Sequence, residues 1–377
     1  MDANRRRLIR KGATAALLAI SLILILTIAR NAGLVEKLYS EGLYRLVRNL
    51  VPPVFNAMPF SFGDLVYLFL SGWLLWYAGR LIVALVKGRF PYAGMLILNL
   101  LITAEALTIT FYLMWGLNYF RPSAAVRLEL TDSVFSKAEL LEVTSLLIDS
   151  ANRIRKDLPA SAPTMDNEAI LQYSLQAVRK LAGSSNGFRP IRPKVKVSLI
   201  SAPVSYLGTA GYFNPFTSEA QINGIMPDWL KPLTACHEMA HQMGFGREDE
   251  ANFVGFLAAR DSPVPLIKYS AYYMAAEEFL FDVMLRDTVA YRQLRSRISA
   301  PVLRDYANDR QFWLSYSGAA GRMSSIFYNN YLKFNNQPEG LRTYNRMVGL
   351  TLAWYRKTSG ALGKRPAPAA GRPPAFP

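Results

Sequence analysis

Histidine and cysteine are both scarce in this sequence. Its 377 residues include two histidines, His237 and His241, and one cysteine, Cys236. A single cysteine excludes an internal disulfide framework. Because there are only two histidines, any chemistry that needs imidazole has to use this one pair.

Acidic residues are also few, 27 against 43 basic residues, which gives a net charge of +16. This balance excludes an acidic disordered chain. The basic residues are spread along the chain, and no helix-turn-helix, zinc-finger or aromatic RNA-binding pattern accompanies them. We therefore interpret them as a solvated surface and expect no nucleic-acid partner.

Long apolar runs account for the overall composition. Hydrophobic residues make up 51% of the chain and charged residues 19%, which is too apolar for an ordinary soluble protein and too charged for a wholly embedded one. Residues 12–29, 65–86 and 93–117 are each long enough to cross a bilayer as a helix. We predict a membrane domain of residues 1–120 with three transmembrane helices in contact with the lipid bilayer.

The basic residues near these runs indicate the orientation. A basic cluster precedes the first run, and Arg80, Lys87 and Arg89 surround the short connection between the second and third runs. Such clusters mark the cytoplasmic side. We predict a multi-pass protein of the cytoplasmic membrane whose C-terminal domain is extracytoplasmic. Glu36 and Glu41, in the longer first connection, indicate an interfacial helix there.

Two charged residues fall inside the predicted spans. Arg80 lies close enough to the end of its run for the side chain to reach the headgroups. Glu105 lies near mid-membrane, where it stays protonated, pairs with Arg80 or faces a cavity. We favour structural pairing over a transport role, because a three-span bundle lacks the internal repeats of transporters.

Residues 121–358 predict a mostly helical outer domain. Ser136 and Glu139 form a capping box that opens a helix reaching about residue 158, and another helix is expected over residues 167–181. Residues 359–377 are rich in proline, alanine and glycine, which predicts a disordered tail.

A small sheet is expected within this domain. Residues 194–200 alternate apolar and polar side chains, which predicts a strand with one face open to water. A second short strand is expected at residues 219–223. Strands followed by helices in one compact unit favour the α+β class.

The segment 233–260 contains the pattern H-E-x-x-H. His237 and His241 are four residues apart, so on a helix both imidazoles project from one face and can bind the same metal ion. Glu238 lies beside them, where its carboxylate can take a proton from a metal-activated water. The competing interpretation is an exposed, salt-bridged helix surface. Chance placement of the only two histidines at this spacing is improbable, so we predict a site for one Zn²⁺ per chain.

A hydrolytic zinc site needs a third protein ligand. Since no further histidine or cysteine is available, it must come from an oxygen donor, and Glu248 and Glu250 open the next predicted helix. We favour Glu248 as a metal ligand because Asn252 lies four residues further on the same face and can orient a ligand. Glu250 is the alternative.

Such a site would hydrolyse an amide, with Glu238 as the general base. Tyr206, Tyr212 and Asn214 precede the metal-binding helix, and a strand there would bind an extended peptide by edge pairing. Whether one of these tyrosines, or Tyr344, donates to the oxyanion stays open, because each is more often a core or interface aromatic.

Several runs of the sequence resemble a known family. These are MPFSFGDLVYL (58–68), GYFNPFTSEAQIN (211–223), PLTACHEMAHQMGFGREDEANFVGFLA (232–258) and YLKFNNQPEGLRTYNRMVGL (331–350). They are similar to the bacterial membrane family labelled domain of unknown function 3810, which is grouped with zincin-type peptidases. The resemblance covers most of the chain and implies a membrane-anchored zinc metallopeptidase with a zincin-like domain.

The resemblance also implies roles for individual residues. His237 and His241 match the ligands, and Glu238 the base, of the wider H-E-x-x-H class. Glu248 and Asn252 occupy the matching places of the E-x-x-[AG]-[DN] element of Glu-liganded zinc peptidases. The spacer after His241 is shorter than in most of those enzymes. H-x-x-G also resembles the metzincin turn, where an arginine, residue 247, stands in place of the third histidine.

The first hypothesis is therefore a membrane-anchored, HExxH-type zinc metalloendopeptidase whose substrate is a peptide or protein. The alternative is a non-catalytic zinc-binding receptor or scaffold of the cell envelope, which would bind the metal without hydrolysing peptides. Transport through Glu105 ranks last.

Overall fold

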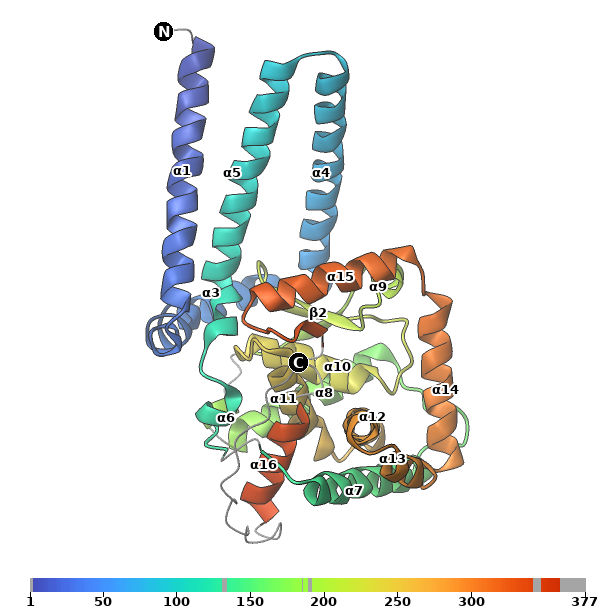
Figure 1. The fold of residues 1–377 in the computed structure, drawn as a ribbon. Coiled ribbons are helices and arrows are strands. Elements are labelled where there is room, and N and C mark those ends of the chain that lie inside the picture. Colours follow the sequence, from blue (N-terminus) through green and yellow to red (C-terminus); the bar gives the residue numbers. More distant parts are fainter. Residues whose placement is uncertain (1–2, 131–133, 185, 189–191, 342–346, 360–377) are drawn as a thin grey trace.

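The computed structural model describes residues 3–130, 134–184, 186–188, 192–341 and 347–359. These residues are mostly helical and include a three-stranded sheet and three apolar N-terminal helices (Figure 1). The predicted α+β class with a transmembrane region is thereby confirmed. Tyr344 and the predicted tail beyond residue 359 lie outside the described residues.

Three helices are long and apolar enough to cross a membrane, namely α1 (Ala3–Ala29), α4 (Phe62–Val86) and α5 (Phe90–Met114). α5 packs against both of the others. Together they project from one side of the outer domain (Figure 1). The three predicted spans are all present, and each helix begins before its apolar run.

The end of α5 differs from the prediction, which extended the helix to residue 117. Trp115 leaves the helical conformation, with φ −159° and ψ −35°, and the chain continues as the 3-10 helix η2 (Gly116–Phe120). The indole Nε1 of Trp115 donates a hydrogen bond to the carbonyl of His241. The helix ends early because this residue is bound to the outer domain.

The connection between α1 and α4 is helical. It comprises α2 (Ala32–Leu34), the wider π-helical segment η1 (Val35–Leu43) and α3 (Tyr44–Asn56). Large apolar side chains along it are exposed, namely Leu38, Leu46, Leu50 and Val54. The helix predicted in this connection is present, and it has an uncovered apolar side.

The two charged residues inside the spans do not pair with each other. Arg80 Nη2 donates to the hydroxyl of Tyr92, and the guanidinium lies 4.8 Å from the ring centroid of Trp76. Glu105 Oε2 is buried without a hydrogen-bond partner among the described residues. The expected pairing of Glu105 with Arg80 is wrong, because Trp76 within α4 and Tyr92 in the first turn of α5 hold the arginine.

The outer domain is built mainly from helices. They are α6 (Ala124–Arg127), α7 (Lys137–Lys156), α8 (Asn167–Ser184), η3 (Asn186–Phe188), α9 (Ser201–Tyr206), α10 (Lys231–Gln242), α11 (Glu248–Arg260), α12 (Pro265–Arg286), α13 (Thr288–Arg295), α14 (Ala300–Ser315), α15 (Ala319–Phe334) and α16 (Met347–Ser359). The predicted capping box is confirmed, since Ser136 and Glu139 exchange side-chain and backbone hydrogen bonds. α8 runs further than the predicted end at residue 181.

The sheet has three short strands, β1 (Val195–Val197), β2 (Gly211–Asn214) and β3 (Glu219–Ile222), in the order β1-β3-β2. β3 pairs parallel with β1 and antiparallel with β2. The strand considered at the stretch with Tyr212 and Asn214 is present as β2. The short β2–β3 turn allows antiparallel pairing and leaves β2 as an edge strand.

The polar face of β1 is buried, which overturns the predicted wet face. Lys196 is 5% exposed and Ser198 4%. Lys196 Nζ donates to Glu219 and to two carbonyls in the connection that precedes α4, and Ser198 donates to Asp64 of α4. The outer end of α4 covers the strand, so its polar residues face buried partners instead of water.

Of the three apolar clusters among the described residues, two organise the outer domain and its junction with the spans. The larger one extends from Ala124 to Ala353 and contains the buried apolar side chains of α10, α11 and α12. The second joins the membrane region to the outer domain, because Phe213 of β2 and Tyr331 of α15 pack against Tyr112 and Trp115. This contact crosses the predicted domain boundary at residue 120.

Glu219 links the outer end of α4 to the sheet, and its removal tests this connection. Its carboxylate accepts from the backbone N–H of Gly63 at 2.6 Å and from Lys196. We expect Glu219→Ala to lower the free energy of unfolding by about 3–5 kcal/mol, because Lys196 stays buried without its countercharge. Asp149→Ala, which removes an exposed pair with Arg297, should cost less than about 1 kcal/mol.

The sole cysteine, Cys236, is fully buried and reports unfolding directly. Its reaction with a maleimide during heating of the detergent-solubilised chain gives the unfolding temperature. Equal unfolding temperatures for Glu219→Ala and Asp149→Ala would show that the carboxylate does not hold α4 to the sheet.

Candidate metal centre

α10 brings the three residues of the H-E-x-x-H pattern to one buried place. His237, Glu238 and His241 are 7%, 4% and 5% exposed. The Nε2 atoms of the two imidazoles lie 3.1 Å apart. The rings point toward each other, and the competing interpretation as an exposed helix surface is wrong because all three side chains are buried.

The other ring nitrogens fix how the imidazoles are oriented. His241 Nδ1 lies 2.7 Å from the carbonyl of Phe245, and His237 Nδ1 lies 2.7 Å from Oδ1 of Asn252. A carbonyl oxygen only accepts hydrogen bonds, so the Nδ1 atoms carry protons as donors. In the neutral rings, both Nε2 lone pairs then face the same point. Histidines that bind metals are oriented in the same way, by a hydrogen bond from the ring nitrogen that does not bind the metal.

Glu248, the first residue of α11, completes this cluster. Its Oε2 lies 3.2 Å from His237 Nε2 and 3.7 Å from His241 Nε2. The hydroxyl of Tyr328 on α15 donates to Oε1 at 2.9 Å. Glu248 is therefore placed where the favoured third ligand was expected, and its carboxylate is held on both oxygens.

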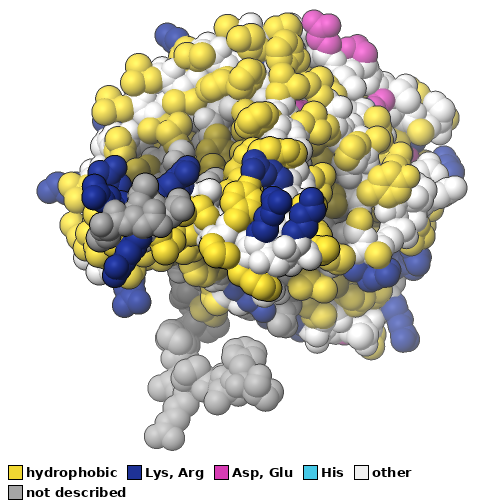
Figure 2. Space-filling model, turned by 90° about the horizontal axis from the view of Figure 1, so that it is seen from above, with side chains coloured by type: hydrophobic (Ala, Val, Ile, Leu, Met, Phe, Trp, Pro, Cys, Tyr) yellow, Lys and Arg dark blue, Asp and Glu magenta, His cyan; other side chains and the backbone are white. Residues whose placement is uncertain are grey.

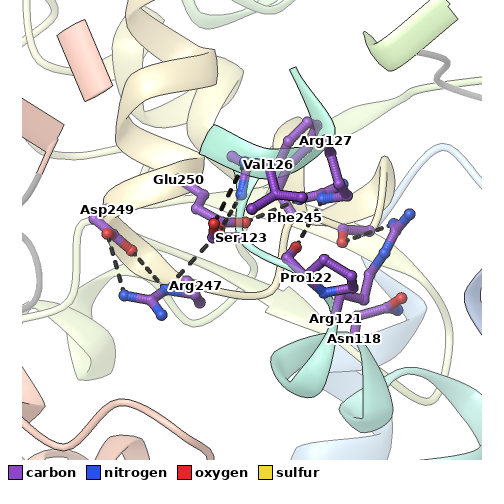
Figure 3. Close-up of polar contacts among 12 residues, drawn as sticks. Asn118, Arg121, Pro122, Ser123, Val126, Arg127, Phe245, Arg247, Asp249 and Glu250 are labelled. Atoms are coloured by element: carbon purple, nitrogen blue, oxygen red, sulfur yellow. Dashed lines mark hydrogen bonds and ion pairs between the residues drawn. The ribbon is translucent and has the colours of Figure 1, made fainter. Parts of the chain in front are cut away.

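Glu250 lies beside Arg127 of α6 and Arg247 of the turn before α11 (Figure 3). Its Oε1 accepts from the backbone N–H of Ala124 at 2.7 Å, and its Oε2 pairs with Arg127 at 2.9 Å. Both oxygens are engaged with α6 and the chain just before it. The alternative third ligand has a structural role instead, because it connects α11 to the start of the outer domain.

A short turn sets α11 against α10. Gly244 has φ +84°, a conformation that side chains disfavour, and its carbonyl accepts from Arg121 at 3.1 Å (Figure 3). Further along, a Cβ at Gly255 would lie 3.0 Å from the backbone N of His237. This close approach of the two helices brings α11 near enough for its first turn to contact the imidazoles.

The C-terminal end of α10 is held by residues of the membrane region. The last carbonyls of a helix lack partners within it. Trp115 Nε1 donates to the carbonyl of His241 at 2.9 Å, and the hydroxyl of Tyr44 donates to the carbonyl of Gln242 at 3.1 Å. The helix that carries both histidines is thus anchored to α3 and to Trp115, which lies between α5 and η2.

Glu238 lies beside the two imidazoles and faces Gly211 of β2. Its Oε2 is buried without a hydrogen-bond partner among the described residues. Burial raises the pKa of this carboxyl to about 7, although the nearby His237 and His241 oppose the shift. A carboxyl with a pKa near neutrality can both accept and release a proton.

The electrostatics of the cluster favour a positive charge. Burial opposes ionisation of His241, but the adjacent Glu248 carboxylate outweighs it and raises the pKa of His241 to about 9. Burial likewise opposes ionisation of Glu248, and the attraction of His241 holds the pKa of that carboxyl well below its usual range. Three acceptors facing one point require a positive charge, which a proton or a metal ion can supply.

The spacing of the three atoms suits a tetrahedral ion. The edges of the triangle formed by both Nε2 atoms and Glu248 Oε2 are 3.1, 3.2 and 3.7 Å. Ligands about 2.1 Å from a tetrahedral zinc ion lie roughly 3.4 Å apart. His237, Glu238 and His241 also offer ligand atoms within 4.8 Å of one another. Glu248 is the better third ligand, because one of its oxygens approaches both imidazoles.

The tyrosines named from the sequence lie elsewhere. Tyr212 is bound to Asp64 and Ser198 through its hydroxyl, and Tyr206 is 54% exposed at the end of α9. Tyr328, which contacts Glu248 directly, was missed. No local sequence pattern marks it, because it meets Glu248 from a position 80 residues away in the chain.

The pattern of the family described as protein of unknown function (DUF3810) matches residues 39–352. The chain belongs to this family. No curated protein and no solved structure matches the chain. The DUF3810 match begins in η1 and ends in α16, so it includes α4, α5 and every residue of the candidate metal centre described above.

Substitution of the two candidate acidic ligands distinguishes them. We expect Glu248→Gln to weaken zinc binding by the full-length chain more than about 100-fold, since even the loss of an outer partner costs 10–100-fold. Glu250→Gln should bind about as tightly as wild type. Zinc titration with a competing chelator measures both, and the maleimide reaction of Cys236 checks that each variant is folded. The reverse order of affinities would make Glu250 the ligand.

Proposed function

We propose that this protein is a membrane-anchored zinc metallopeptidase that hydrolyses peptide bonds. One observation carries the proposal. Two imidazole nitrogens and a carboxylate oxygen converge within 3.1–3.7 Å of one another, and a second carboxylate, Glu238, stands beside them with one oxygen that no described residue hydrogen-bonds. This combination supplies three ligands and a separate proton acceptor, which a hydrolytic zinc site needs.

In this proposal His237, His241 and Glu248 would hold the ion. Zinc, when bound, supplies Lewis-acid chemistry that polarises a carbonyl and acidifies water. Glu238 Oε2 takes a proton from the attacking water and returns it to the amide nitrogen as the bond breaks. Asn252 and Tyr328 keep His237 and Glu248 oriented during this exchange, and burial of the site excludes competing solvent.

The substrate would be an extended polypeptide. β2 is one of the two edge strands of the sheet, and its Gly211 faces Glu238. A peptide paired along such an edge gains affinity from main-chain hydrogen bonds. On β2 the peptide would lie next to Glu238, the proposed proton acceptor. Tyr212 and Asn214 belong to this strand. The stretch proposed to pair with a peptide is therefore an edge strand.

The outer domain would lie outside the cytoplasm. The basic residues before α1 and between α4 and α5 are the basis for this orientation. A membrane-tethered peptidase placed there would act on envelope polypeptides.

The proton acceptor is tested by Glu238→Gln. We expect hydrolysis of a peptide library to fall about 10²–10⁴-fold, because the amide cannot take up the proton, while zinc remains bound at about one ion per chain. Glu142→Gln, on the exposed side of α7, is the control and should retain full activity. Unchanged hydrolysis by Glu238→Gln contradicts the assigned role, and bound zinc without hydrolysis even in wild type indicates the receptor or scaffold.

The orientation is tested by labelling single cysteines in intact bacterial cells. Val289 on α13 is 62% exposed, and Lys87 lies in the connection between α4 and α5. A membrane-impermeant maleimide should label Val289→Cys and leave Lys87→Cys unlabelled until the cells are lysed. Cys236 is buried and contributes little background. The opposite labelling pattern would place the outer domain in the cytoplasm.

A further inference from the structure

α15 has an exposed apolar face. Four large side chains on it are strongly exposed, namely Met323 (72%), Ile326 (65%), Phe327 (74%) and Phe334 (65%). Their spacing of three, four and seven residues places them on one side of the helix. Arg322 and Lys333 are exposed beside them, so basic groups border the apolar face.

The opposite face of α15 contacts the outer domain and the metal centre. Leu332 is fully buried, Tyr328 donates to Glu248, and the hydroxyl of Tyr331 donates to that of Tyr119 at 3.3 Å. Because these residues point into the protein, the apolar face defined above points away from it.

α15 lies at the level where the spans meet the outer domain. Near its start, a Cβ at Gly321 would lie 3.1 Å from the carbonyl of Tyr206 in α9. At its other end, the ring of Tyr331 lies 6.1 Å from that of Phe111 in α5, and Asn335 accepts from Tyr112. In Figure 1 the helix crosses the side of the outer domain from which α4 and α5 project.

Other apolar side chains on this side of the domain are exposed as well. Phe60, just before α4, is 38% exposed, and Leu199 is 53% exposed. The backbone N–H of Leu199 donates to Asp64 in the first turn of α4, which places it at the outer end of that span. Seen from the side of the spans, the surface is largely apolar with scattered basic groups (Figure 2).

We propose that α15 lies in the interfacial layer of the bilayer that its own spans cross, with its apolar face among the lipids. Three observations favour lipid over a second copy of the chain. The face lies level with the outer ends of α4 and α5 (Figure 1), the apolar side chains of those two helices are themselves exposed, and Arg322 and Lys333 suit anionic headgroups. α15 thereby links the membrane surface on one side to Glu248 on the other.

The test measures the depth of α15 directly and needs neither metal nor activity, so its outcome is independent of the proposed function. Nitroxide labels are attached to Phe327→Cys and Asn330→Cys in the full chain, in nanodiscs of phosphatidylethanolamine and phosphatidylglycerol. Asn330 lies on the same exposed face, and its substitution keeps all four apolar side chains. Val289→Cys and Leu146→Cys, on α13 and α7 at the far side of the outer domain (Figure 1), are the matched exposed controls.

We expect oxygen to relax the labels at residues 327 and 330 several-fold more effectively, relative to a water-soluble nickel chelate, than the labels at residues 146 and 289. Equal ratios at all four sites would overturn the proposal, because the face would then be in water. Protection from both reagents, with broadening between labels, would also overturn it, since a second copy would then cover the face. If Phe327→Cys does not fold, the label at residue 330 alone tests the proposal.

Discussion

The structure is organised around three acceptor atoms that face one point. The Nε2 atoms of His237 and His241 and a carboxylate oxygen of Glu248 lie within 3.1–3.7 Å of one another and away from water. Lone pairs at this spacing repel unless a positive charge stands among them. The rings cannot turn away, because each Nδ1 is committed to an acceptor. The fold therefore maintains an arrangement that only a cation, H⁺ or a metal ion, satisfies.

This arrangement ties the membrane region to the outer domain. The helix bearing the histidines ends on carbonyls that accept from Trp115 and Tyr44, both outside the outer domain. Glu219, in the strand beside that helix, accepts from the N–H groups that open α4. The apolar spans thus act as structural partners of the centre as well as a membrane anchor. The DUF3810 match, which extends over residues 39–352, includes both halves of this contact.

Local spacing carried most of what could be predicted. His237 and His241 share a helix face because they are four residues apart, and Ser136 and Glu139 meet for a similar reason. Glu248 could be ranked above Glu250 only because Asn252 lies one turn further on. Tyr328, in contrast, meets Glu248 across 80 positions of the chain. No periodicity encodes such a contact, so it and the early end of α5 at Trp115 required the structure.

The wrong prediction of a wet face on β1 has a general physical cause. An alternating or helical pattern shows that an element has two unlike faces, but it does not show what covers each face. The polar face of β1 is covered by the end of α4, where buried ion pairing replaces water around Lys196. α15 also has two unlike faces. One carries Tyr328, which contacts Glu248, and the other carries exposed apolar side chains. Single exposed apolar residues such as Val289 need no partner. The four apolar side chains of α15 share one helix face and lie level with the ends of two spans. The bilayer, rather than water or the protein interior, is the environment that suits this face.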